Sequence, residues 1–463
     1  MAPNKNAIFP LTASDSSSPA VSPTEDDENT SLLQKKKNRV VATGMEEPSS
    51  SRSIYRMKKN DQDVVEKVST LSVINPMIDT SIVCLFVVKF DLKIGYQVEH
   101  QMQNSSNPIN LNGIEYKCLP SGTHKLDTDI VLFRHVNDNT EYFGLGCVDI
   151  FRSKDLDRGS RIRALGILSR DYRGVMTHMT FLRNCIQGMN ACDNTEDGRK
   201  YIHHLTEYFQ NHDSNSKINQ RRLSEITKEE IDNHLNFGSL ISLFYFYREN
   251  IFTLWKAILL KKRILISTSV PIGSGCSKAH AMHFLTYFAP QQDYTYIESH
   301  FGKNINFCYY ISLNDYSHLL QMKSYLACTC DEILESKPEC YDVLLKDRQV
   351  IIPDKTLKQT LKKSESDEEK SKMLDNLLNQ IAHLSRIEQE AIFRKYFAFI
   401  NNQTILFLGN QDKRAQVNKH IMSTERKNGT LPLWGDDIYF VKELAELIGL
   451  DIEFTTSRPF CCC

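Results

Sequence analysis

A glycine-rich stretch between a predicted strand and a predicted helix is the first place where this sequence could do chemistry. Residues 273–278 read Gly-Ser-Gly-Cys-Ser-Lys, and backbone N–H groups at such a junction can cradle a phosphate. A P-loop needs two glycines five positions apart, followed by Lys and then Ser or Thr. Here the glycines are two apart and Lys278 precedes Ala279. An ordinary strand-to-helix turn is the favoured interpretation, and direct nucleotide binding is the alternative.

Cysteines and histidines in the second half of the chain could bind a metal. Cys328, Cys330 and Cys340 lie close together in the sequence, but structural zinc usually takes two ligand pairs, and no second pair is visible. His280 and His283 are three apart on a predicted helix, with no third ligand in view. We interpret the cysteines as buried thiols and the histidines as packing or surface residues. No metal and no cofactor is predicted.

The sequence also lacks the usual signatures of covalent and metal catalysis. It contains no G-x-S-x-G elbow, no H-E-x-x-H pair and no set of kinase motifs. A binding or scaffold function is therefore favoured over catalysis through a nucleophile or a metal.

Two groups of basic residues could contact a partner. Arg158, Arg161 and Arg163 surround a glycine, and arginine pairs in a bidentate manner with carboxylate or phosphate. The alternative is a solvated loop with local ion pairs. A second basic run, residues 261–263, ends a predicted helix, where cations complement the helix dipole.

The chain ends in three cysteines, Cys461, Cys462 and Cys463. A C-a-a-X prenylation box would need a cysteine at position 460, where Phe460 stands. Exposed terminal cysteines could instead be S-acylated, and two acyl chains anchor a protein stably where one binds only marginally. Lipidation is one interpretation of the triplet, and unmodified thiols are the other.

Hydrophobic periodicity predicts the elements that position these residues in the first half. Apolar runs typical of strands lie at 82–88, 130–133, 142–148 and 163–168. The first run is apolar on both faces, as in a strand covered on both sides. Residues 91–95 form a turn that leads into a hairpin, and a helix with one apolar face is predicted over 172–186. We expect an antiparallel sheet with helices that ends near residue 210.

The second half alternates helices and strands before it becomes helical. The predicted elements are a long helix at 244–259, a strand at 264–266, a loop at 271–275, a helix at 278–288, and strands at 307–311, 324–328 and 341–345. This alternation is typical of an α/β domain. The charged segment 358–372 is expected to be a solvated connection. One helix is then predicted from 374 towards 397 and another apolar stripe at 438–448, which Gly449 ends.

Composition and charge narrow the class of protein. The 463 residues correspond to about three units, and 56 Lys and Arg against 57 Asp and Glu give no sign of a nucleic-acid partner. No apolar run approaches the ~18 to 20 residues of a membrane helix, and no signal peptide is recognisable. We expect a cytoplasmic protein with reduced thiols, and a peripheral position on endomembranes if it is lipidated.

The predicted organisation has five parts. A disordered N-terminal arm, residues 1–78, is rich in Ser, Pro and charge and too polar to bury a core. An antiparallel unit, an intervening linker, an α/β unit and a helical unit follow at 79–210, 211–236, 237–355 and 356–463. The overall class is α/β, in the α+β sense.

Several of these segments resemble DENN-domain proteins, in particular the LCHN-like family of DENN domain-containing protein 11. Residues 83–91, 113–125, 143–145 and 158–169 are similar to the longin-type N-terminal module, and residues 254–267 and 324–343 to the central DENN module. The resemblance implies a longin-like antiparallel sheet, then the central α/β DENN module, then a helical downstream module.

The resemblance also implies a function, which is guanine-nucleotide exchange on a Rab GTPase in membrane trafficking. The implied contact candidates are Asp127, Asp129, Arg158, Arg161, Arg163, Lys261, Lys262 and Arg263. The basic run at 261–263 could equally face a membrane. Two alternatives stay open: an adaptor that leaves the nucleotide state unchanged, and a GTPase-activating protein that uses Arg158 as an arginine finger, since Arg158-Gly159 resembles that position in folliculin-like relatives.

Overall fold

The computed structural model describes residues 77–104, 108–154, 156, 159–192, 196–213, 220–222, 237–286, 305–411, 416–418, 422, 433 and 435–455. The expected arm up to residue 76 lies outside these ranges, as do Arg158 and the terminal cysteines. Of the expected linker, the described part includes a short strand, β7 (Gln220–Arg222), which pairs antiparallel with β1 (Met77–Asp79).

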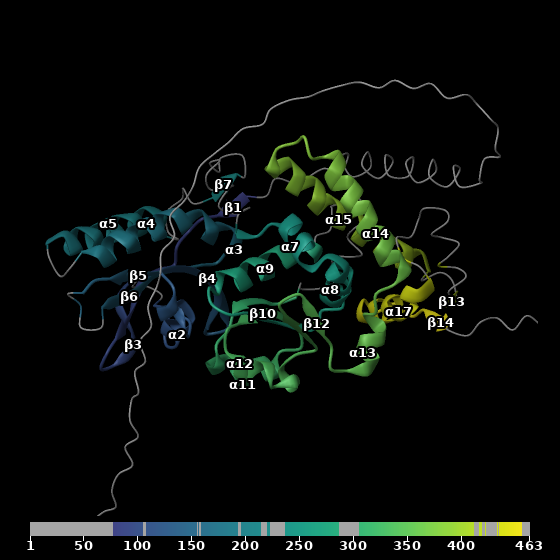
Figure 1. Cartoon of the computed structure of the whole chain (residues 1–463), viewed down its shortest axis with the longest axis horizontal. Coiled ribbons are helices and arrows are strands. Elements are labelled where there is room, and N and C mark those ends of the chain that lie inside the picture. The colour runs from purple at the N-terminus through teal and green to yellow at the C-terminus, as the bar shows by residue number, and fades with distance from the viewer. Residues whose placement is uncertain are drawn as a thin grey trace, which may run out of the picture. The chain divides into compact units, whose positions relative to one another are not determined.

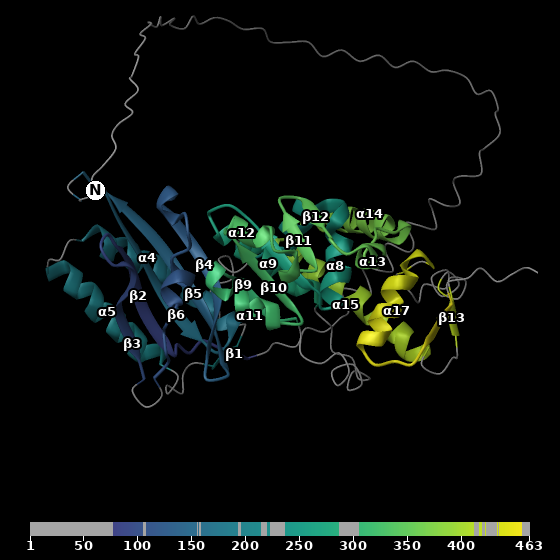
Figure 2. The same ribbon diagram turned by 90° about the horizontal axis from the view of Figure 1, so that it is seen from below.

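A ten-stranded mixed sheet organises most of the described chain (Figures 1 and 2). Its strands are β2 (Cys84–Asp91), β3 (Gly95–Gln103), β4 (Thr128–Asn137), β5 (Thr140–Arg152), β6 (Ser160–Ser169), β8 (Arg263–Ser267), β9 (Phe307–Tyr310), β10 (Tyr325–Thr329), β11 (Val343–Lys346) and β12 (Gln349–Ile351). The order across the sheet is β12-β11-β8-β10-β9-β4-β5-β6-β2-β3. The mixed α/β class predicted from sequence is confirmed.

The sheet has two halves of opposite character. Strands β2 to β6 pair antiparallel, and we call them the antiparallel half. Strands β8 to β11 pair parallel, and we call them the parallel half. The halves meet where β4 runs parallel to β9, with Phe133 opposite Tyr310.

Helices and 3₁₀ turns (η) connect the strands and complete the fold. They are α2 (Ile114–Cys118), η1 (Thr123–Lys125), α3 (Tyr172–Val175), η2 (Met176–His178), α4 (Met179–Ala191), α5 (Glu196–His212), α7 (Leu240–Tyr247), η4 (Arg248–Asn250), α8 (Ile251–Leu259), α9 (Gly273–His283), η5 (Phe284–Thr286), η6 (Leu313–Asp315), α11 (Tyr316–Gln321), α12 (Glu332–Glu335), η7 (Pro338–Cys340), α13 (Lys355–Thr360), α14 (Glu365–Gln380), α15 (Arg386–Gln411), η8 (Gly435–Asp437) and α17 (Ile438–Leu447). A further pair of strands, β13 (Gln416–Asn418) and β14 (Glu453–Thr455), runs parallel. None of the described helices is both long and apolar enough to cross a bilayer.

Both faces of the antiparallel half are covered. On β5, a Cβ added at Gly146 would lie 2.6 Å from the Sγ of Cys118 on α2. The next residue, Cys147, instead donates its thiol to the carbonyl of Met179 on α4. Because neighbouring strand residues point to opposite faces, α2 and α4 cover opposite sides of the sheet. This explains why the 82–88 run is apolar on both faces.

The parallel half is covered in the same way. Every residue of β10 is buried, and its side chains alternate between two hydrophobic clusters. Leu326 and Cys328 join the main core beside α9, whereas Tyr325 and Ala327 join a smaller core that includes Leu319 of α11. Parallel strands buried on both faces read as continuous apolar runs, which is the pattern that sequence analysis identified.

Two predicted boundaries in this half are wrong. The expected long helix at 244–259 is interrupted, because Arg248 adopts a positive φ of 43° and a 3₁₀ turn separates α7 from α8. The expected loop at 271–275 is shorter than predicted, since α9 already begins at Gly273. The glycines therefore lie in the first helical turn instead of in a loop before it.

The prediction that the charged segment 358–372 is a solvated connection is also wrong. It contributes the second half of α13 and the first part of α14, and Asp367 and Lys370 of α14 are buried. Asp367 pairs with Lys370 and with Lys256 of α8, whose Nζ lies 2.7 Å from a carboxylate oxygen of Asp367 and 2.7 Å from one of Asp437. Sequence analysis read these charges as solvent-exposed because it could not pair residues more than 100 positions apart.

Candidate functional site

Of the two aspartates named as contact candidates, Asp129 on β4 has a structural role. Its carboxylate accepts hydrogen bonds from the backbone N–H groups of Ile130, Ile272 and Gly273, at 2.8, 2.8 and 3.0 Å. The N–H groups of Ile272 and Gly273 lie at the start of α9, so Asp129, which is on the antiparallel half, caps a helix that packs on the parallel half. Burial raises the pKa of Asp129, although the three N–H donors oppose the rise. The side chain is 6% exposed and clamps the two halves together.

Asp127, two residues earlier, faces solvent. Its side chain is 86% exposed and pairs with Arg152 at the end of β5, with 3.2 Å between Oδ1 and Nε. An exposed pair of this kind contributes little to stability. Asp127 is therefore accessible to a partner, which Asp129 is not.

The arginines of the β5–β6 region also differ from one another. Arg163 forms a bidentate pair with Glu99 of β3, at 2.9 and 3.0 Å, and its side chain is only 12% exposed. Burial works against it, yet Arg163 and Lys89 hold the pKa of Glu99 below its usual value. Arg161 donates to the carbonyls of Asn190 and Cys192 at the end of α4.

The basic run at the end of α8 is drawn into ion pairs. Arg263 binds Asp342 through its guanidinium and its backbone N–H, and Asp342 raises the pKa of Arg263. Lys262 pairs with Glu443 of α17. Lys261 has a positive φ of 51°, and burial lowers its pKa. These residues lie in the parallel half and in the helices beyond it, so the structure does not bring them together with Asp127 and Arg161.

The start of α9 gives no support to phosphate binding. The N–H groups of Ile272 and Gly273, which would face a phosphate, already donate to the carboxylate of Asp129. A Cβ added at Gly273 would lie 2.8 Å from the carbonyl oxygen of Ile130. The glycine is needed for this close approach of α9 to β4.

The three cysteines considered for zinc contact different neighbours. Cys328 lies 3.6 Å from Cys276, Cys330 donates to the carbonyl of Ser121, and Cys340 is buried in the smaller core. Burial raises the pKa of Cys330 to about 11 and that of Cys328 well above its usual value, which favours the protonated thiol in both cases. Within the described residues no group of three His, Cys, Asp or Glu side chains could hold a metal.

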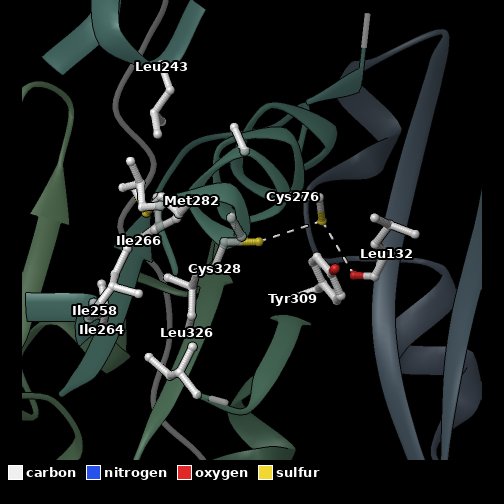
Figure 3. Packing of buried hydrophobic residues seen from close by; sticks show 14 of the residues in the cluster. Leu132, Leu243, Ile258, Ile264, Ile266, Cys276, Met282, Tyr309, Leu326 and Cys328 are labelled. Carbon is white, nitrogen blue, oxygen red and sulfur yellow. Dashed lines mark hydrogen bonds between the residues drawn. The ribbon is translucent and has the colours of Figure 1, made fainter. Parts of the chain in front are cut away.

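Sequence analysis missed the contacts that join the two halves. Figure 3 shows Cys276 of α9 between Cys328 of β10 and the carbonyl of Leu132 on β4, 3.4 Å away. Lys117 of α2 reaches Asp315 of η6 at 3.0 Å, on the opposite face of the sheet from α4. The two contacts that cross between the halves, Cys276 with Leu132 and Lys117 with Asp315, join residues more than 100 positions apart, so no local pattern could reveal them.

Comparison with known proteins identifies the family. The sequence profile of "DENN domain-containing protein 11" matches residues 85–358, which is more than half of the chain. The chain belongs to the DENN domain-containing protein 11 family. The matched segment covers the ten-stranded sheet almost in full, from the second residue of β2 through β12, and ends within α13.

Individual proteins are also similar to this chain, and two with the family's name match it over more residues than the family profile does. The chain is 27% identical over 406 residues to DENN domain-containing protein 11 of Rattus norvegicus, which covers 83% of this chain and 84% of the rat protein. It is 26% identical over 395 residues to the protein of the same name from Danio rerio, with 82% and 77% covered. An uncharacterized yeast protein, ANR2 of Saccharomyces cerevisiae, is 26% identical over 311 residues, 57% of either chain.

Proposed function

We propose that this DENN-family protein is a guanine-nucleotide exchange factor that releases GDP from a Rab GTPase. The observation that carries the proposal is the match to the DENN domain-containing protein 11 family across the ten-stranded sheet. DENN domains generally act on Rab GTPases in this way. The clamps between the two halves support the proposal further, since exchange needs a surface of fixed shape.

Exchange of this kind needs no nucleophile and no metal of the factor's own. The factor binds nucleotide-free GTPase more tightly than loaded GTPase, and that difference in affinity weakens GDP binding by the same factor. Each tenfold loss of GDP affinity corresponds to about 1.4 kcal/mol of differential binding. Of the residues proposed as GTPase contacts, Asp127 is the most exposed described side chain, and we place it first among them.

The direct test is release of fluorescent GDP from a panel of purified Rab GTPases. We expect the full-length protein to accelerate release from one or a few of them by about tenfold or more, and Asp127→Ala to reduce this acceleration without a change in melting temperature. If the folded protein accelerated GDP release from none of the Rab GTPases in the panel, the result would contradict exchange activity. Binding without any rate change would make the protein an adaptor. Faster GTP hydrolysis, lost in Arg158→Ala, would make it a GTPase-activating protein.

S-acylation of Cys461, Cys462 and Cys463 remains a second proposal. Three consecutive cysteines offer several thiols to an acyltransferase, and two acyl chains suffice for stable membrane attachment. Changing all three cysteines to serine should move the protein from the membrane fraction of cells to the soluble fraction. An unchanged distribution in fractionated cells would rule the proposal out.

A further inference from the structure

The turn between β2 and β3 presents two aliphatic side chains to solvent. Leu92 is 45% exposed and Ile94 is 73% exposed, the highest value among the exposed large hydrophobic residues of the described chain. The carboxylate of Asp91 accepts from the N–H groups of Lys93 and Ile94 at 2.8 and 3.1 Å, and Gly95 supplies a positive φ of 88°. The turn is thus held by its own hydrogen bonds, and the two side chains project from a fixed backbone.

Lysines surround this turn. Lys93 lies between the two aliphatic residues, Lys125 lies in η1, and Lys154 follows β5 at the same end of the antiparallel half. All three are exposed, and none forms an ion pair in the described part of the chain. The carboxylates nearby are engaged, since Asp91 holds the turn and Asp127 pairs with Arg152. Among these described residues, four cations (Lys93, Lys125, Lys154 and Arg152) stand against two carboxylates (Asp91 and Asp127), which is an excess of positive charge.

A pocket of about 590 Å³ continues the apolar surface inward from the turn. Its lining combines apolar side chains, among them Phe90, Leu92 and Ile162, with polar ones, among them His124 and Arg161. It opens between the β2–β3 turn, the η1 segment and the start of β6. The same loops that carry the lysines thus border a hollow lined by both apolar and polar side chains.

We propose that this end of the antiparallel half docks on an anionic membrane surface, with Leu92 and Ile94 inserted at the headgroup boundary and Lys93, Lys125 and Lys154 facing the headgroups. Aliphatic side chains beside lysines are typical of segments that lie in the membrane interface. Protein interfaces are instead enriched in aromatic residues and arginine and depleted in lysine. The composition of this surface therefore favours a lipid surface over a protein partner.

This surface differs from the basic run at 261–263, whose Lys262 and Arg263 already pair with Glu443 and Asp342. Attraction to an anionic leaflet needs cations that are not neutralised by the protein itself. The proposal goes beyond nucleotide exchange, because it assigns a membrane contact that would exist with any GTPase or with none.

The test is co-sedimentation of full-length protein with lipid vesicles. The protein is made in bacteria with Cys461, Cys462 and Cys463 changed to serine, so that acylation cannot contribute. Vesicles contain phosphatidylcholine alone or phosphatidylcholine with phosphatidylserine. We expect binding to the anionic vesicles only, and binding that weakens as salt is added.

Two double variants probe the surface, with a third as the matched control. A lysine near an anionic leaflet contributes about a fivefold factor, so K93E/K125E should weaken binding by about 25-fold or more. L92S/I94S should weaken it by roughly tenfold or more. The control L313S/I333S changes two residues that are similarly exposed, at 44% and 55%, on the parallel half, and should bind as the parent does.

The outcomes separate the membrane contact from the exchange activity. No binding of the parent to anionic vesicles, or unchanged binding of a folded L92S/I94S variant, would overturn the membrane contact. Loss of GTPase binding with intact vesicle binding in that variant would show that the surface is a protein interface. GDP release is measured without vesicles on L92S/I94S, which we expect to act as the parent does; K93E/K125E is left out of this readout because Lys125 lies two residues from Asp127. Failure of release in all proteins would contradict only the exchange proposal.

Discussion

Replacing Lys256 by Met is expected to lower the free energy of unfolding by about 3 to 5 kcal/mol, the cost of removing one partner from a buried ion pair. The Lys256 Nζ lies 2.7 Å from Asp367 and 2.7 Å from Asp437, and these three side chains are at most 1% exposed. The variant leaves two buried carboxylates, and among the described residues Lys370 is the cation that still pairs with Asp367. Denaturant unfolding of the parent and the variant measures the difference.

The network joins three elements that are far apart in the sequence. Lys256 is on α8, Asp367 and Lys370 are on α14, and Asp437 immediately precedes α17. Ser366 adds a hydrogen bond to Asp437 at 2.6 Å. Two lysines and two aspartates balance in charge, which makes burial of the group tolerable. The C-terminal helices are thus held against α8 by this group as well as by apolar packing.

The same network sets a pH window for stability. Burial opposes ionisation, but Lys370 and Lys256 hold the pKa of Asp367 well below its usual range. Its contribution is therefore fully present above the unfolded pKa of about 3.9 and is lost as pH falls through the folded value. Burial also opposes the charge of Lys256, but Asp437 and Asp367 raise its pKa. That contribution is present below about pH 10.4 and is lost as pH rises through the folded value. Lys256→Met should be less sensitive to pH at both ends.

Two further variants test whether the loss of stability in Lys256→Met arises because the ion pair is buried. Asp375→Asn breaks an ion pair with Arg248 of the same 2.7 Å length, but both side chains are about half exposed, so the loss should stay below about 1 kcal/mol. Lys256→Met combined with Asp437→Leu restores the charge balance around Asp367 and Lys370, and should recover much of the lost stability. A single variant as stable as the parent, or a double variant less stable than the single one, would contradict this account.

What the sequence could predict here depended on whether the signal was local. Continuous apolar runs predicted both kinds of strand, since β2 and β10 are each buried on two faces. Charge gave the wrong prediction at Asp367, because a charged residue reads as exposed unless its partner is known, and its partner Lys256 is 111 positions away in the sequence. The break between α7 and α8 was equally invisible, since the positive φ of Arg248 has no glycine to mark it.

The candidate contacts show the same limit. Asp127 and Asp129 are two positions apart, where β4 begins. This spacing does not reveal that the two side chains have different roles. One is 86% exposed and the other is 6% exposed, because only Asp129 meets the N–H groups that open α9. A resemblance to DENN proteins predicted the family, but not which of its charged residues are available to a partner.

The second large effect is expected from Asp129→Ala. The change removes the acceptor of three backbone N–H groups, two of which open α9. Loss of a helix cap, with buried donors left unsatisfied, should cost about 2 to 4 kcal/mol. Because Asp129 joins β4 to α9, we expect the damage at the boundary between the two halves. Hydrogen exchange should accelerate in the first turn of α9 and along β4 before the rest of the sheet opens.

Asp127→Ala is the matched control for that variant, since it removes the same side chain two residues away from an exposed pair. Stability should be unchanged, so any loss of GDP release in Asp127→Ala reports a contact with the GTPase. Loss of release in Asp129→Ala instead reports the alignment of the two halves, and it should come with faster hydrogen exchange. If Asp129→Ala kept parental stability and protection, the carboxylate would not be clamping α9, and the exchange surface would not depend on this joint.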